Sequence, residues 1–151
     1  MLTRVLLPYQ IEVKNMIELT IKGVSVDPTG NFFVLLVDDK DTNVLPINIG
    51  KLEAQSIAIP IEGIDLPRPM THDLLKSTIE SLGGKTEKIV ITGIENDTYF
   101  AEIYISQQGK EIILDSRPSD AIALALRCDA PVFMEFKLIE FTYDLSDISL
   151  K

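Results

Sequence analysis

The sequence predicts an α+β domain made of two β-β-β-α repeats, whose strands form a mixed or antiparallel sheet, with a connecting helix between the repeats. Each half of the chain carries three segments of strand composition followed by one helical segment. When the first half of the sequence is aligned with the second, Phe33 corresponds to Phe100 and Ala54 to Ala121. Agreement in both element order and register indicates an internal duplication.

The first repeat begins with two predicted strands, "MIELTIKGVSV" and "NFFVLLVDD", joined by the turn "DPTGN". "TNVLPINIG" supplies a third strand. A helix is predicted in "KLEAQSIAI", where apolar residues recur at the i, i+3, i+4 and i+7 spacing of one buried face. These residues are Ala54, Ile57, Ala58 and Ile61. Pro60 and Gly63 end or bend this helix.

The connecting segment, "IDLPRPMTHDLLKSTIESLGG", predicts a further helix. The prolines around Arg68 hold the chain extended, and Thr71 is a good N-cap because its hydroxyl can accept from an unpaired amide. Asp73 then lies at the positive end of the helix, and Gly83 or Gly84 closes it. The buried face is predicted to consist of Leu75, Ile79 and Leu82.

The second repeat consists of the predicted strands "GKTEKIVITGI", "DTYFAEIYI" and "GKEIILD" and the helix "PSDAIALALRC". Its aromatic residues Tyr99, Phe100 and Tyr104 are interpreted as sheet packing. We expect an N-terminal arm over residues 1–15, a domain over 16–135 and a C-terminal tail over 136–151 without an assigned structure. Met16 is a second candidate for the initiator.

The composition of the 151 residues is acidic, with a net charge of -9 at pH 7. This charge opposes broad binding of a phosphate backbone, so any contact with nucleic acid has to be local. No apolar run approaches the roughly 18 residues of a membrane span, and the start of the chain lacks a signal-peptide pattern. We therefore expect a cytoplasmic protein with no membrane partner. The single cysteine, Cys128, excludes an internal disulfide.

Several familiar catalytic motifs are missing from the sequence. It contains no P-loop, no G-x-G-x-x-G after a strand, no H-E-x-x-H and no G-x-S-x-G. Their absence argues against nucleotide kinases, Rossmann enzymes, zincins and α/β-hydrolases.

The stretch "DSRPSDAIALAL" concentrates charged residues at a predicted helix start. Helix capping accounts for Pro118, Ser119 and Asp120. Capping does not account for Arg117, nor for Glu53 at the position that corresponds to Asp120. Carboxylates at Glu53 and Asp120, with Asp115 or Asp73 as a third ligand, would suit Mg²⁺ or Mn²⁺. A cap or a salt bridge is the alternative.

His72 is the only histidine, so any imidazole acid–base role has one candidate. The alternative is an exposed residue at the helix start with no function. Cleavage of a phosphodiester needs carboxylates, an arginine on the phosphate and a group that moves a proton. His72, Arg117 and Asp120 are therefore the candidate catalytic residues. Arg68, Arg117 and Ser119 are the candidate substrate-binding residues.

Four segments together resemble the bifunctional nuclease domain family: "VLPINIG", "EAQSIAI", "RPMTHDLL" and "DSRPSDAIALAL...APVF", in the same order. The resemblance covers roughly Ile17 to Phe133. It implies an α+β domain and degradation of both DNA and RNA. Asn48 departs from the family, whose members often carry an aromatic residue there, typically tryptophan. The roles given to individual residues above come from their chemistry and not from the resemblance.

Two functional hypotheses follow. The first is a nuclease that hydrolyses phosphodiester bonds of DNA and RNA with the help of a metal ion. The second is a non-enzymatic homo-oligomeric binding or regulatory module, with a dimer favoured, whose strand edges pair between subunits and whose polar residues form caps and salt bridges. A regulator that binds a small molecule is a third possibility.

Overall fold

The computed structural model describes residues 15–148, which form one eight-stranded mixed sheet and three α-helices. The predicted α+β fold class is confirmed. Most of the expected arm over residues 1–15 lies outside the described residues. The strands and helices are β1 (Met16–Val26), β2 (Phe32–Asp38), β3 (Asn43–Ile49), α2 (Lys51–Glu62), α3 (Thr71–Ser81), β4 (Lys85–Glu95), β5 (Thr98–Gln107), β6 (Lys110–Ser116), α4 (Pro118–Cys128), β7 (Val132–Glu135) and β8 (Tyr143–Asp144).

The strand order across the sheet is β6-β5-β4-β7-β1-β2-β3-β8. Neighbouring strands are antiparallel, except that β4 and β7 are parallel. β7 therefore lies between the first strands of the two halves and joins them into one sheet. Each half supplies three strands and then a helix, as predicted. The interpretation of this order as a duplication stays a prediction.

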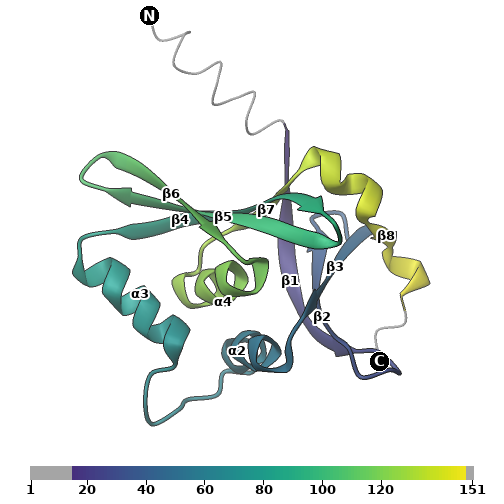
Figure 1. The fold of residues 1–151 in the computed structure, drawn as a ribbon, viewed down its shortest axis with the longest axis horizontal. Coiled ribbons are helices and arrows are strands. Elements are labelled where there is room, and N and C mark those ends of the chain that lie inside the picture. Colours follow the sequence, from purple (N-terminus) through teal and green to yellow (C-terminus); the bar gives the residue numbers. More distant parts are fainter. Residues whose placement is uncertain (1–14, 149–151) are drawn as a thin grey trace, which may run out of the picture.

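The helices pack in the angle of the bent sheet. In Figure 1, strands β4 to β6 run across the top, β1 to β3 run down the right, and the three helices lie between them. The central helix α4 packs against α2, α3, β4 and β5, and its residues 121–125 are buried. Leu36, Ile91 and Leu124 lie fully buried where the helices meet the sheet. No helix within residues 15–148 is long and apolar enough to cross a membrane.

The C-terminal tail, which the sequence left unassigned, packs on the sheet. A 3-10 helix at Phe136–Phe141 leads into β8, and a second one follows at Leu145–Asp147. β8 pairs with β3 at the sheet edge. Leu145 and Ile148 cover a small apolar cluster formed by Leu35, Val37 and Val44. The tail therefore covers apolar side chains of β2 and β3 that are separate from the main core.

Two details of α3 differ from the prediction. The N-cap is Met70 and not Thr71. The Asp73 carboxylate accepts a hydrogen bond from the Met70 amide at 2.8 Å, and the helix therefore begins one residue earlier than predicted. The side chain of Leu82 is 69% exposed, although it was predicted to be buried. Leu82 follows the last helical residue and has left the apolar face of the helix. Gly83, with a φ of 83°, closes α3 as predicted.

Candidate functional site

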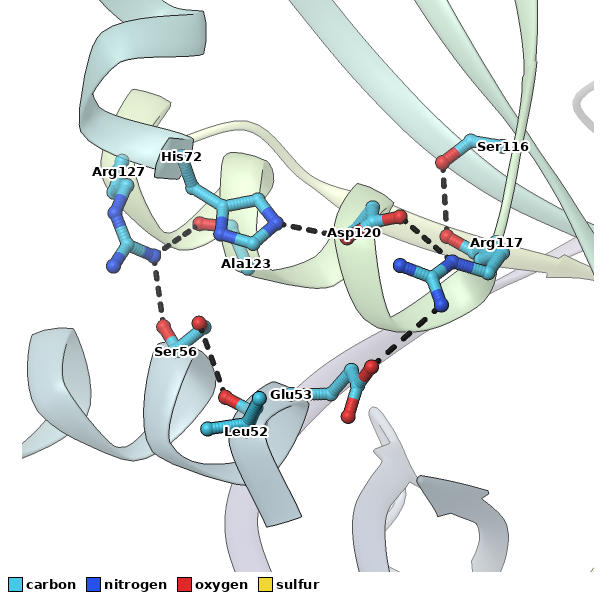
Figure 2. A network of polar contacts seen from close by, with 9 residues as sticks. All are labelled: Leu52, Glu53, Ser56, His72, Ser116, Arg117, Asp120, Ala123 and Arg127. Carbon is cyan, nitrogen blue, oxygen red and sulfur yellow. Dashed lines mark hydrogen bonds and ion pairs between the residues drawn. The ribbon is translucent and has the colours of Figure 1, made fainter. Parts of the chain in front are cut away.

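Four side chains form a continuous chain of polar contacts beside the start of α4 (Figure 2). His72 Nε2 lies 2.9 Å from Asp120 Oδ1, and Arg117 Nε donates to Asp120 Oδ2 at 3.0 Å. On its other side, Arg117 Nη1 lies 3.6 Å from Glu53 Oε1. The order of the chain is therefore His72, Asp120, Arg117, Glu53. Two of the predicted ligands, Glu53 and Asp120, meet at the same arginine.

The local sequence explains this convergence. Each of the three helices contributes a residue of its first turn: Glu53 from α2, His72 from α3 and Asp120 from α4. Pro118 occupies the first position of α4, where its missing N–H leaves no helical bond unmade, and this starts the helix directly after Arg117. The three helix starts therefore meet at one place, although His72 and Asp120 are 48 residues apart.

The charges of Asp120 and Arg117 stabilise each other. Burial by itself would raise the pKa of the Asp120 carboxyl, but the hydrogen bonds with His72 and Arg117 outweigh burial and hold that pKa below its usual value. The hydrogen bond with Asp120 in turn raises the pKa of the Arg117 guanidinium. Asp120 and Arg117 are therefore both ionised at neutral pH.

The interpretations of these residues as simple helix features hold only in part. Asp120 lies in the first turn of α4, but its oxygens contact His72 and Arg117, so the salt bridge named beside the cap as the alternative is the one present. His72 is not an exposed residue at the helix start, since only 9% of its surface is accessible. Its Nδ1 atom is buried and lacks a hydrogen-bond partner within the described chain.

Arg127 holds the three helices together, a role that the sequence did not reveal. Its side chain is 6% exposed and donates to Asp73 Oδ1 at 2.7 Å. Its Nη1 donates to the carbonyls of Ser56 and Ala123, each at 2.8 Å (Figure 2). The Ser56 carbonyl lies four residues before Pro60, which has no N–H to donate to it. Arg127 therefore supplies the hydrogen bond that Pro60 cannot make.

A cleft of about 650 Å³ opens beside Arg117. Among the predicted residues, Glu53, Arg117 and Ser119 line it. His72 and Asp120 are not among its lining residues and connect to it through Arg117. The remaining lining residues come from β2, β3, the β4–β5 hairpin, the residues flanking α2 and α4, and the tail: Phe33, Pro46, Ile47, Asn48, Ile49, Gly50, Ile94, Asp97, Thr98, Tyr99, Pro118, Glu140, Phe141, Thr142 and Tyr143.

The structure does not bring all the predicted residues together. Arg68 lies exposed in the connector between α2 and α3, and Asp115 lies exposed on β6. Neither lines the cleft. Within residues 15–148, no three histidine, cysteine, aspartate or glutamate side chains are grouped so that they could hold a metal ion. The three predicted ligands, Glu53, Asp115 and Asp120, therefore do not form one ligand set in this arrangement.

Comparison with known proteins places these residues in a family. Residues 34–143 match the family described as the bifunctional nuclease domain. An uncharacterized protein of Mycobacterium tuberculosis (strain ATCC 25618 / H37Rv) is 35% identical over 119 residues, which cover 78% of this chain and 71% of that protein. Bifunctional nuclease 1 of Oryza sativa subsp. japonica is 31% identical and Bifunctional nuclease 2 of Arabidopsis thaliana is 28% identical, each over 102 residues. These matches cover 66% of this chain but only 31% of each plant protein. The chain therefore belongs to the bifunctional nuclease domain family.

Proposed function

We propose that this protein hydrolyses phosphodiester bonds of DNA and RNA at the Arg117 end of the cleft. The observation that carries the proposal is the series of polar contacts that links His72, Asp120, Arg117 and Glu53. It holds the Arg117 guanidinium at the cleft beside the Glu53 carboxylate. The names of the plant relatives are consistent with this activity. The formal charge of -9 limits the contact with nucleic acid to this local site.

Arg117 is the group that would bind the phosphate. Its side chain is 69% exposed, while its Nε is held by Asp120. The contact of Arg117 Nη1 with Glu53 is 3.6 Å, longer than a hydrogen bond, so a phosphate oxygen can replace it. The guanidinium then neutralises the charge that builds up on the phosphoryl oxygens during attack.

Glu53 is the candidate general base. Its side chain is 27% exposed and lines the cleft next to Arg117. When a phosphate takes its place on Arg117, the carboxylate is left free to accept a proton from an attacking water. The water oxygen bonds to phosphorus as the P–O bond to one nucleoside oxygen breaks, and that leaving oxygen takes a proton from solvent. Its place on the first turn of α2 holds it beside the phosphate.

His72 and Asp120 would act through Arg117. Asp120 fixes one edge of the guanidinium, and His72 fixes Asp120. His72 is buried and does not line the cleft, which favours a positioning role over direct proton transfer to the substrate. Its predicted role as a catalytic acid or base stays a prediction. The pH dependence of cleavage by a His72→Gln variant would distinguish a positioning role of His72 from direct proton transfer.

The predicted Mg²⁺ or Mn²⁺ does not fit the residues as they lie. The Arg117 guanidinium contacts both carboxylates, and so stands where an ion bridging Glu53 and Asp120 would have to bind. Metal assistance requires Arg117 to move away from one of them.

The test is cleavage of end-labelled single-stranded DNA and RNA by the purified protein, with Mg²⁺, with Mn²⁺ or with EDTA. Glu53→Gln is expected to lower the rate at least 100-fold, the usual effect of removing a general base. Glu62→Gln is the matched control, because it makes the same change on an exposed residue at the other end of α2. Equal rates for both variants, or no cleavage by the unaltered protein, would refute the proposal.

A second candidate function is the non-enzymatic homo-oligomeric module, which β6 favours. This strand lies at one edge of the sheet and carries three exposed apolar residues: Ile112, Ile113 and Leu114. An exposed edge strand of this kind pairs readily with another strand. On this hypothesis Arg117, Asp120 and Glu53 form only a structural ion-pair network. Full stability and a defined oligomer without any turnover would support it.

A further inference from the structure

The cleft beside Arg117 is also lined by four aromatic residues, which we call its aromatic wall. Tyr143 and Phe141 come from the tail, Tyr99 from β5 and Phe33 from β2. Tyr143 is 59% exposed and Phe141 is 38% exposed. Burial raises the pKa of Tyr99, and the nearby Tyr143 raises it further. Large exposed aromatic side chains that gather in one cleft indicate a site for a flat apolar group.

We propose that these aromatic residues form a subsite for an unpaired nucleobase, while Arg117 holds the adjacent phosphate. This inference rests on the proposed function, because the activity at Arg117 gives the phosphate its place. Every nucleobase has a π-face that stacks on an aromatic ring, so the subsite accepts both DNA and RNA. The inference adds a substrate class to the proposed function: single strands whose bases are free to leave the stack.

The dimensions and the polar groups of the cleft agree with this ligand. A volume of about 650 Å³ lies within the range of pockets that hold one small molecule of nucleotide size. The exposed Asn48 lies opposite Phe33 across the β2–β3 pair and offers both a donor and an acceptor to a base edge. A base inside a duplex has its faces covered by neighbouring bases and its edge paired, so it cannot use this wall.

The charge of the cleft limits how much of the strand is bound. Arg117 is the only basic residue among the described residues that line it, against the acids Glu53, Asp97 and Glu140. A groove that followed a backbone over many nucleotides would instead carry many cations. We therefore expect one phosphate contact, with stacking as the larger part of the affinity. For a single strand, one contact gives a slope of about -0.7 in log affinity against log salt.

The test measures binding without turnover. Fluorescence anisotropy follows a labelled hexathymidylate, an abasic hexamer with the same phosphates, and a G·C-rich duplex long enough to stay paired at the assay temperature, each in EDTA and checked for intact length afterwards. We expect the single strand with bases to bind at least 10-fold more tightly than the other two. Equal binding of the abasic strand or the duplex, or no binding of any of them, would overturn the inference.

Variants locate the subsite. Tyr143→Ala is expected to weaken binding of hexathymidylate on the order of 10-fold, whereas Tyr143→Phe keeps the ring and the affinity. Phe136→Ala is the matched control: Phe136 is 57% exposed, lies in the same tail and does not line the cleft. The same affinity for Tyr143→Ala and Phe136→Ala would rule out the subsite. Base-dependent binding without any cleavage would instead refute the nuclease and keep the subsite, so the two failures are distinguishable.

Discussion

Replacing Asp73 by asparagine tests the ion pair that joins α3 to α4. The Asp73 carboxylate accepts from Arg127 Nε at 2.7 Å and from the Met70 amide at 2.8 Å. Removing one partner of a fully buried pair costs about 3 to 5 kcal/mol. Arg127 is 6% exposed but Asp73 is 40% exposed, and asparagine keeps one oxygen that can accept. We therefore expect the free energy of unfolding to fall by about 2 kcal/mol at pH 7.

The effect should depend on pH with a definite sign. The hydrogen bond from the Met70 amide lowers the pKa of Asp73, burial raises it, and the contact with Arg127 lowers it again, so that this pKa lies below its usual value in the folded protein. The stability that the ionised carboxylate contributes is thus present above its unfolded pKa, and it is lost as the pH falls through the lower folded pKa. At pH 7 the full difference between the two proteins is expected. Below the folded pKa, a protonated aspartate and an asparagine should be nearly equivalent.

The assay is urea denaturation followed by circular dichroism between pH 3 and pH 7. Asp65→Asn is the matched control, because Asp65 lies exposed in the connector and undergoes the same change of charge. A midpoint for Asp73→Asn equal to that of the control at pH 7 would show that the pair adds no stability. A difference that stayed constant down to pH 3 would show that the loss comes from packing and not from charge.

Three further predictions concern other parts of the molecule. Ile91→Ala should lower the free energy of unfolding by about 4 kcal/mol in the same urea assay, because Ile91 is fully buried in β4. Ile113→Lys on β6 should leave stability within about 0.5 kcal/mol, since Ile113 is 49% exposed, but should turn the predicted homo-oligomer into a monomer in light scattering. An unchanged mass would exclude pairing through β6. Burial raises the pKa of the Cys128 thiol, so iodoacetamide should alkylate it more slowly than free cysteine at pH 7, and equal rates would contradict that shift.

The strands and helices of the two halves were predictable because their patterns are local. The alternation in β5 and the apolar face of α4 each lie within one short segment, where spacing alone distinguishes strand from helix. The strand order was not predictable in the same way. β7 is four residues long, and its Val132 pairs with Ile89 of β4, which lies 43 residues earlier in the chain (132 − 89). Nothing local in the sequence of β7 specifies that partner.

The candidate site was predicted in part for the same reason. Unusual charged residues at the helix starts drew attention to Glu53, Arg117 and Asp120, and the structure brings these residues together. Which acid contacts which base depends on how three helices pack. One signal for Arg127 was present in the sequence, since Pro60 inside α2 leaves the Ser56 carbonyl without its helical donor. That signal shows that a donor is needed but does not identify it.

The aromatic wall of the cleft shows the limit of periodicity as a guide. Phe141 and Tyr143 belong to a 3-10 helix and to a strand of two residues, both too short to show a repeat. Tyr99 was interpreted as sheet packing, and it does pack against the core, yet it also lines the cleft. A residue on a strand near the sheet surface can have both roles, and only the packing of the tail reveals the second one.

The position of β7 has a consequence for how the protein is made. During synthesis the strands β1 to β3 and β4 to β6 can each form hairpins soon after they leave the ribosome, because their partners are adjacent in the chain. No strand joins one hairpin set to the other until residues 132–135 emerge and pair with both β1 and β4. Ile17 meets Met134 in that step. Joining the two halves is thus a late and non-local event, and a nascent chain stopped before Val132 would expose the unpaired edges of two separate sheets.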